Sequence, residues 1–171
     1  MKVKHILSAF LGLALLSSSC ESLDYTRPDQ LSDKTFWKTE LHAKQAAVGL
    51  YQAMMQPWCF GLEFAFDMCT DLADGTSPFA DISRGTSFAS TSGAVQNHWQ
   101  YLYELIHRSN TVIRNVSAMD IDQSKIDPII GEAKFLRAMT YFRMLNCWGG
   151  VPYYDETCII EEEFATVTSP R

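Results

Sequence analysis

The stretch Gly131-Glu132-Ala133-Lys134-Phe135-Leu136-Arg137-Ala138, followed by Trp148-Gly149-Gly150-Val151-Pro152, decides the fold of this chain of 171 residues. The first part predicts a helix that runs to about Cys147. Gly149-Gly150 predicts its end, because glycine adopts a positive φ without steric cost. Val151–Tyr154 is expected to continue in extended form. Largely apolar side chains cover more than one face of this helix, which indicates that it is mostly buried: Ile129, Ile130, Ala133, Leu136, Met139, Thr140 and Phe142.

The start of this helix has two alternatives in the sequence. Asp127-Pro128 is typical of an N-cap followed by proline at the first helical position. Ser124-x-x-Asp127 offers a start one turn earlier, as a capping pair. Both remain open from the sequence.

Two more helices are predicted upstream, at about 39–56 and 94–117. The first carries apolar residues at three-and-four spacing and ends at Pro57. A short helix is expected within 60–72. The stretch 74–94 is rich in Gly, Ser, Thr and Asp, which predicts a long surface loop with a short helical turn.

The predicted helix at 94–117 is marked by one stripe: Trp99, Leu102, Tyr103, Ile106, Asn110 and Ile113. With a short connection at 119–122 and no convincing strand, the fold class is all-α. Its last two helices suggest a tetratricopeptide-like pair.

The N-terminus predicts export and lipidation. Lys2, Lys4 and His5 precede an apolar run over 6–16, which is too short to cross a bilayer that needs about 20 residues. Three serines then lead to Cys20, in the manner of a bacterial lipobox. We therefore expect a lipoprotein signal peptide at 1–19, lipidation of Cys20 and a tether at 20–33. The alternative is an ordinary secretory signal in which Cys20 is a chance cysteine.

Composition indicates a folded domain and argues against a nucleic-acid partner. The chain is 47% hydrophobic and 12% aromatic, which is typical of a packed core. Its net charge of −6 and the absence of a basic stripe exclude the usual electrostatic footprint of nucleic-acid binding. Four cysteines follow the proposed lipidation site without the spacing of a zinc site: Cys59, Cys69, Cys147 and Cys158. A Cys59–Cys69 disulfide and free buried thiols both remain open.

Three blocks of sequence, taken in order, resemble the SusD/RagB family of outer-membrane lipoproteins. They are Phe36–Glu40 with Ala46–Tyr51, the stripe from Trp99 to Ile113, and Ile130–Ala138 with Tyr141-Phe142 and Gly149–Pro152. The resemblance implies a lipid-anchored, mostly helical protein at the cell surface. It would sit on a SusC-like TonB-dependent outer-membrane transporter and pass it an oligosaccharide or, in some relatives, a peptide. Residues 34–171 would form the N-terminal helical domain of a family whose members usually run for several hundred residues more.

No catalytic residue, cofactor site or metal site is predicted. Arg137 and Glu132 lie five positions apart, which does not place them well on one helical face, so structural roles are expected for both. Asn110 is expected to hydrogen-bond backbone, and His98 to be partly exposed at the start of its helix. An acidic cluster lacks the alternating oxygens of a calcium loop: Asp67, Asp71, Asp74 and Asp81.

Three residues are candidates for contact with a glycan. Phe79 and Arg84 lie in the predicted loop, and loops on rigid scaffolds often carry binding residues. Trp99 lies at the end of that loop, although its place on the helical stripe also suits core packing. Two other functions remain open: a lipid-anchored tetratricopeptide-like scaffold that binds proteins, and a surface glycosidase that uses Asp71 or Asp74.

Overall fold

A computed structural model describes residues 36–61, 63–75, 79–86 and 93–158, all within one compact unit. The predicted signal peptide, Cys20 and the tether lie outside the described residues. The described part is mostly helical and contains no strand, so the all-α prediction is confirmed. Within it, no helix combines the length and the apolar character that a membrane span requires.

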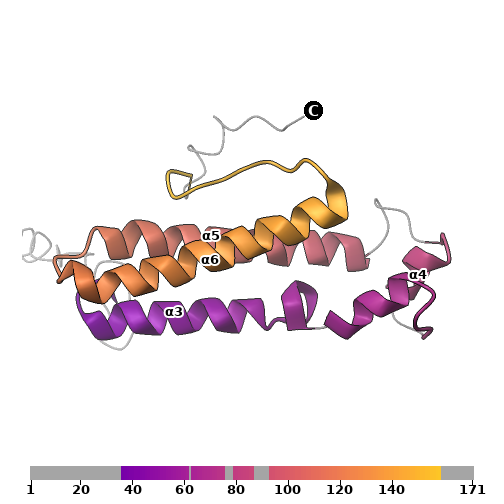
Figure 1. Cartoon of the computed structure of the whole chain (residues 1–171), viewed down its shortest axis with the longest axis horizontal. Helices are drawn as coiled ribbons and strands as arrows, with labels where there is room; N and C mark the ends of the chain where they lie inside the picture. The colour runs from indigo at the N-terminus through magenta and orange to yellow at the C-terminus, as the bar shows by residue number, and fades with distance from the viewer. Residues whose placement is uncertain (1–35, 62, 76–78, 87–92, 159–171) are drawn as a thin grey trace, which may run out of the picture. The chain divides into compact units, whose positions relative to one another are not determined.

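Three long helices build the fold: α3 (Glu40–Met54), α5 (Gly93–Ser117) and α6 (Gln123–Trp148). Residues 118–122 join α5 to α6, and these two helices lie side by side in opposite directions (Figure 1). α3 packs against both of them. The bounds of α3 and α5 agree with the predicted ranges, 39–56 and 94–117, to within two residues.

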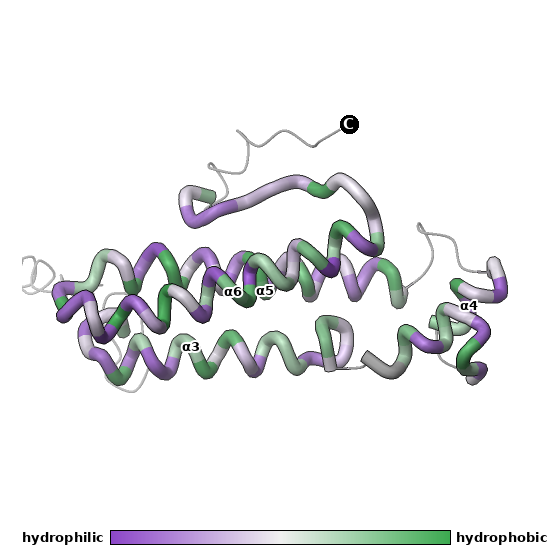
Figure 2. Tube along the Cα trace, viewed as in Figure 1, coloured by the Kyte–Doolittle hydropathy of each residue, from purple (hydrophilic) through white to green (hydrophobic). Residues whose placement is uncertain are grey.

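The core lies where α3, α5 and α6 meet, and each helix contributes one apolar face to it. Hydrophobic and hydrophilic residues alternate along all three helices in Figure 2, as expected of helices with a buried and a solvated side. The largest fully buried apolar side chains are Leu50, Leu102, Leu105, Ile106, Ile126, Leu136, Met144 and Val116.

α6 begins earlier than either predicted start. Asp122 is its N-cap, and the Asp122 carboxylate accepts a hydrogen bond from the backbone N–H of Ser124 at 3.0 Å. Pro128 therefore lies inside the helix. Its ring removes one backbone hydrogen bond from the helix there. At the other end, Gly149 has φ +76° and donates its N–H to the Leu145 carbonyl, as the sequence predicted.

The expectation that α6 is mostly buried is wrong for one of its faces. Phe135 and Phe142 are each 66% exposed, and Leu145 is 52% exposed. The reason is that α3 and α5 both pack against the opposite face of α6. Apolar residues around a helix predict burial only where a second packing partner is present.

Between α3 and α5 the chain forms three short elements: η1 (Pro57–Gly61, a π-helix), η2 (Glu63–Cys69, a 3₁₀-helix) and α4 (Ala80–Ser83). Pro57 thus ends α3 and starts a wider turn. Gly61 closes this turn so tightly that an added Cβ would come within 2.3 Å of the Met55 carbonyl oxygen. A small second cluster, made of Ala65, Phe79 and Ala94, packs these elements against the start of α5.

Candidate functional site

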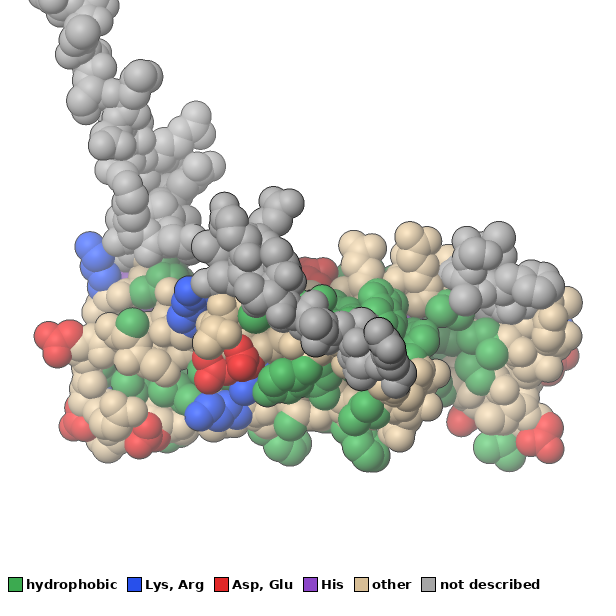
Figure 3. All heavy atoms as spheres, turned by 90° about the horizontal axis from the view of Figure 1, so that it is seen from above, with side chains coloured by type: hydrophobic (Ala, Val, Ile, Leu, Met, Phe, Trp, Pro, Cys, Tyr) green, Lys and Arg blue, Asp and Glu red, His purple; other side chains and the backbone are tan. Residues whose placement is uncertain are grey.

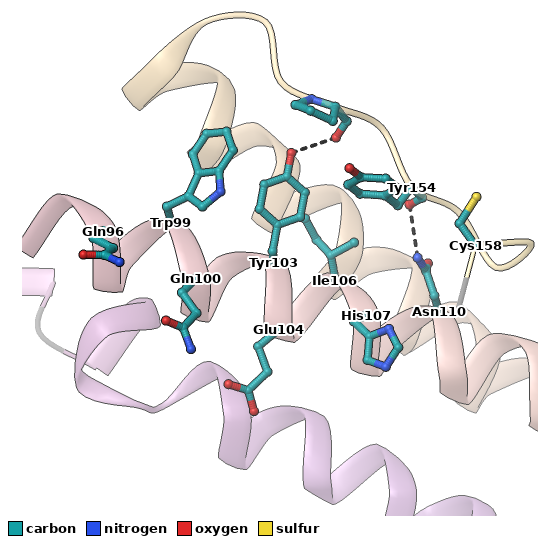
Figure 4. A pocket seen from close by; sticks show the side chains of 11 residues that line it. Gln96, Trp99, Gln100, Tyr103, Glu104, Ile106, His107, Asn110, Tyr154 and Cys158 are labelled. Carbon is teal, nitrogen blue, oxygen red and sulfur yellow. Dashed lines mark hydrogen bonds between the residues drawn. The ribbon is translucent and has the colours of Figure 1, made fainter. Parts of the chain in front are cut away.

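A groove of about 830 Å³ runs between α5 and residues 151–158, which we call the strap (Figure 4). The strap follows α6 and turns back along the helices. One side of the groove is formed by successive turns of α5, and the other by the strap. The lining residues are Gln96, Trp99, Gln100, Tyr103, Glu104, Ile106, His107, Asn110, Pro152, Tyr154 and Cys158.

Three aromatic residues give the groove its apolar surface. Trp99 and Tyr103 lie one turn apart on α5, and their ring centroids are 5.0 Å apart. Tyr154 of the strap meets the Tyr103 ring edge-on at 5.6 Å. The Tyr103 hydroxyl donates a hydrogen bond to the Pro152 carbonyl at 2.8 Å, and burial raises the pKa of this hydroxyl. The aromatic rings are therefore held by one another and by the strap.

Polar side chains of the groove come from the exposed side of α5. Gln96, Gln100 and His107 are exposed, and Glu104 is half-buried. The Glu104 carboxylate accepts two hydrogen bonds from Arg108, at 2.6 and 3.0 Å, which fixes its position. The groove thus combines flat aromatic faces with amide, imidazole and carboxylate groups.

The strap is fastened to α5 and α6 by buried polar contacts. Asn110, which is fully buried, donates to the Tyr154 carbonyl at 3.1 Å. Arg137 Nη1 donates both to Asn110 Oδ1 at 2.7 Å and to Glu156 Oε2 at 2.5 Å. The hydrogen bond from Arg137 holds the pKa of the Glu156 carboxyl below its usual value. Arg137 and Asn110 have the structural roles that the sequence predicted, whereas Glu132 is exposed on α6.

The three residues predicted to contact a ligand do not lie together. Trp99 lines the groove, where it also packs edge-on against Trp148 at 5.1 Å. Phe79 is only 3% exposed, with its ring against Trp58 and Phe66, so neither of its faces is open to a ligand in this structure. Phe79 therefore belongs to the second hydrophobic cluster and not to an exposed loop surface, because aromatic rings of η1 and η2 pack around it.

Arg84 is exposed but is engaged by two carboxylates. It forms a hydrogen-bonded ion pair with Asp74 and a longer pair with Asp81 at 3.8 Å. A hydrogen bond from the Gly75 N–H, followed by one from Arg84 and by the positive charge of Arg84, keeps the pKa of the Asp74 carboxyl below its usual value. Two carboxylates of the predicted acidic cluster, Asp74 and Asp81, are thus paired with Arg84. Among the described residues, no group of three or more His, Cys, Asp or Glu side chains is arranged to hold a metal ion.

Two further expectations change with the structure. His98 is 3% exposed rather than partly exposed, and its Nδ1 lies 2.6 Å from the Trp58 carbonyl oxygen. Cys59 and Cys69 are free thiols, so the alternative of a disulfide between them does not hold in this structure. Burial raises the pKa of the Cys59 thiol to about 12, which makes it unreactive at neutral pH.

Sequence reasoning did not assign the strap residues of the groove, Pro152, Tyr154 and Cys158. Pro152 was noted only as part of the motif that ends the helix, and nothing in the local pattern marks Tyr154 or Cys158, because they reach the groove only through the reversal of the chain after Gly149. The polar lining residues Gln96 and Gln100 were also missed. One signal was present for them: they flank Trp99 on the exposed side of an amphipathic helix.

Comparison with known protein families gives one match over most of the chain. Residues 21–171 match a SusD-like family model described as "Starch-binding associating with outer membrane". The match includes α3, α5, α6 and the strap, and therefore every residue that lines the groove.

Three curated proteins of Formosa agariphila are similar to the chain. SusD-like protein P25 is 29% identical, in an alignment that covers 95% of this chain and 33% of the relative. SusD-like protein P38 is 29% identical over 90% of this chain and 31% of the relative, and SusD-like protein P2 is 27% identical over 85% and 30%. The chain thus spans about a third of the length of the curated relatives it matches. No solved structure is a significant match.

Proposed function

The chain belongs to the SusD-like family of starch-binding proteins that associate with the outer membrane, and on this premise we propose that it captures glycans at the cell surface for uptake. The proposal involves binding and release without any chemical change to the glycan. The alignment covers 33% of the relative SusD-like protein P25, and the groove between α5 and the strap is the binding surface that we propose for this chain.

The observation that carries the proposal for this chain is the groove between α5 and the strap. Trp99, Tyr103 and Tyr154 offer aromatic rings, which stack on the apolar faces of sugar rings. Gln96 and Gln100 offer amide groups, which can donate to and accept from sugar hydroxyls. An apolar floor with a few polar groups at its rim is the usual construction of a small-molecule site.

The proposed location is the outer membrane, with lipidated Cys20 as the anchor and a SusC-like TonB-dependent transporter as the partner. The family description supports the membrane association, and the sequence before Cys20 supports the anchor. Labelled palmitate should be incorporated into the protein in a bacterial host, and Cys20→Ala should abolish this incorporation. Incorporation that persists in Cys20→Ala would contradict the assignment of Cys20.

Glycan binding is tested with the purified whole chain and soluble starch, by isothermal titration calorimetry or by retardation in a starch-containing native gel. We expect the Gln96→Ala/Gln100→Ala variant to bind at least about threefold more weakly, because both exposed amides line the groove. Gln52→Ala is the matched control, since Gln52 is exposed on α3 outside the groove. Neither variant removes buried surface, so both should remain folded.

Trp99→Ala extends the test to the aromatic surface. We expect a loss of about 1–3 kcal/mol in starch binding if Trp99 stacks on a sugar, the range that aromatic contacts usually contribute. Since Trp99 also packs against Trp148, helix content must be checked by circular dichroism. Starch binding that is equal in the wild type, Gln96→Ala/Gln100→Ala and Trp99→Ala would exclude the groove as the site.

A further inference from the structure

His98 is a buried histidine of α5 that does not line the groove. Its side chain is 3% exposed, and its Nδ1 lies 2.6 Å from the backbone carbonyl oxygen of Trp58 in η1. Because a carbonyl oxygen can only accept, Nδ1 carries a proton and donates this hydrogen bond. Burying a polar side chain costs free energy even when it is paired, so the filling of space alone does not account for a histidine here.

Aromatic rings surround the imidazole of His98. From the short elements before α5, the rings of Phe66 and Phe79 meet it edge-on, with centroids 5.1 and 6.5 Å away. From α6, the indole of Trp148 stacks on it at 5.6 Å, with the two planes 30° apart. The imidazole thus connects the second cluster with the last residue of α6.

Trp148 in turn connects His98 to the groove. Its indole packs edge-on against Trp99, with centroids 5.1 Å apart and planes 87° apart. His98 and Trp99 are consecutive residues of α5, so their side chains leave the helix about 100° apart around its axis. The ring of Trp148 is therefore held between a residue that lines the groove and a residue that is buried behind it.

Trp99 needs a defined orientation if a sugar is to stack on its ring. Figure 3 shows the face that carries the strap, where hydrophobic side chains gather over the helices. Hydrophobic contact has no preferred direction, so by itself it allows a ring to pack at several angles. A binding side chain is effective when the residues around it fix its rotamer. The edge-on contact with Trp148 limits the angles that the indole of Trp99 can adopt.

We infer that His98 is a positioning residue of the groove: its ring holds Trp148, and Trp148 sets the angle at which Trp99 faces a sugar. The hydrogen bond to the Trp58 carbonyl satisfies the buried imidazole and anchors it to η1. This inference rests on the proposed function, in which Trp99 contacts the glycan. The shape of the groove then depends on a buried residue and on the short elements between α3 and α5.

Two variants separate the ring of His98 from its hydrogen bond. His98→Asn keeps an N–H close to the position of Nδ1 but removes the ring that stacks on Trp148. His98→Phe keeps a ring but removes the donor to the Trp58 carbonyl, which should lower the midpoint of urea denaturation. If the ring positions Trp99, His98→Asn changes the groove and His98→Phe does not.

The orientation of Trp99 is measured by fluorine NMR of the whole chain labelled with fluorotryptophan. The chain has four tryptophans, and the variants Trp99→Phe and Trp148→Phe assign two of the four resonances. Without any glycan, His98→Asn should shift the Trp99 resonance, whereas His98→Phe should leave it at its wild-type position. Starch binding should be about three- to tenfold weaker in His98→Asn, as expected for the loss of one aligned aromatic contact, and unchanged in His98→Phe.

Val116→Ala is the matched control for a general loss of stability. Val116 is fully buried on α5, about five turns from His98. The variant should lower the midpoint of urea denaturation but leave the Trp99 resonance and starch binding unchanged. His98→Met is a second variant without a ring, and its flexible side chain fills buried gaps. It should shift the Trp99 resonance as His98→Asn does.

The inference is overturned if the variants without a ring, shown by circular dichroism to be folded, leave the Trp99 resonance unchanged. It is also overturned if Val116→Ala or His98→Phe shifts this resonance as much as His98→Asn does. A wild type that binds no starch would instead overturn the proposed function. The positioning of Trp99 by His98 would still be decided by the resonances, because they are measured without glycan.

Discussion

The Tyr141 hydroxyl forms two hydrogen bonds with the backbone of Tyr154: it donates to the carbonyl at 3.0 Å and accepts from the N–H at 2.6 Å. One side chain of α6 thus replaces the pair of backbone contacts that a neighbouring strand would provide. The extended strap stays close to the helices although no sheet is present among the described residues. This contact fixes the position of Tyr154 in the groove.

Removing the Tyr141 hydroxyl should loosen the strap. Tyr141→Phe keeps the ring in the core but leaves a half-buried N–H without its acceptor, which should cost about 1–3 kcal/mol of the free energy of unfolding. Urea denaturation measures this loss. Tyr51→Phe, which removes an exposed hydroxyl on α3, should leave the midpoint unchanged. Equal midpoints for wild type and Tyr141→Phe would show that these two hydrogen bonds do not stabilise the fold.

Alkaline pH should destabilise the protein through the same residue. Burial raises the pKa of Tyr141 to about 12 in the folded state, from an ordinary value of 10.0. The unfolded chain therefore loses this proton first, and the stabilising contribution is complete below pH 10 and lost as the pH rises to about 12. Stability measured from pH 9 to pH 11.5 should fall less steeply in Tyr141→Phe than in the wild type. Tyr103, whose pKa is also raised, accounts for part of the remaining slope.

Acid should weaken the attachment of the strap at Glu156. The pKa of Glu156 lies below its ordinary value of 4.5 because Arg137 donates a hydrogen bond to it. The contribution of this pair is therefore present above pH 4.5 and lost as the pH falls through the folded-state pKa. Glu156→Gln keeps an acceptor but loses the charge, and the Glu156 side chain is 37% exposed, so the variant should lower stability at pH 7 by no more than about 1 kcal/mol and by less at pH 3. A difference that is the same at both pH values would contradict this account.

Two glycines should respond to alanine in opposite directions. Gly131→Ala should stabilise the chain by about 1 kcal/mol, because the helix gains a better helix former and the new methyl group meets no neighbour. Gly61→Ala should destabilise it by about 1–3 kcal/mol, because its methyl group would overlap the Met55 carbonyl. Thermal melting of both variants, monitored by circular dichroism, gives the two signs directly. If both variants were stabilised, or both destabilised, the packing described at one of the two glycines would be wrong.

Phe79 and Arg84, five positions apart, should differ sharply in their effect on stability. Phe79→Ala empties a buried ring position and should cost about 3–5 kcal/mol. Arg84→Ala removes exposed ion pairs with Asp74 and Asp81 and should cost no more than about 1 kcal/mol. Urea denaturation of the two variants checks this. A small effect of Phe79→Ala would instead favour an exposed, ligand-facing ring.

The sequence predicted the helices well because their patterns are local. The stripe on α5 and the glycine that ends α6 both act within a few residues, and both are found as expected. The start of α6 was misplaced because Asp127-Pro128 and Ser124-x-x-Asp127 are also good cap signals, whereas the helix uses Asp122, whose carboxylate accepts from the Ser124 N–H. The buried position of Phe79 and the exposure of Phe142 depend on which elements meet, and residue type alone does not determine that.

The candidate groove was predictable on one side only. Trp99 was identified from its position at the end of the loop, on an amphipathic helix. Tyr154 and Cys158 reach the groove through contacts with residues about 45 positions earlier in the chain, such as the bond from Asn110 to Tyr154. Such long-range neighbours leave no periodic signal in the sequence.

The way in which the strap is fastened also imposes an order of folding. Its hydrogen bonds join residues that are 49, 44, 19 and 13 positions apart: Tyr103 to Pro152, Asn110 to Tyr154, Arg137 to Glu156, and Tyr141 to Tyr154. All four donors lie on α5 or α6, and the two on α5, Tyr103 and Asn110, can meet their strap acceptors only once these helices have formed their hairpin. The strap therefore docks late, after the hairpin that it covers. A nascent chain has no groove until residue 154 has been synthesised and has folded back.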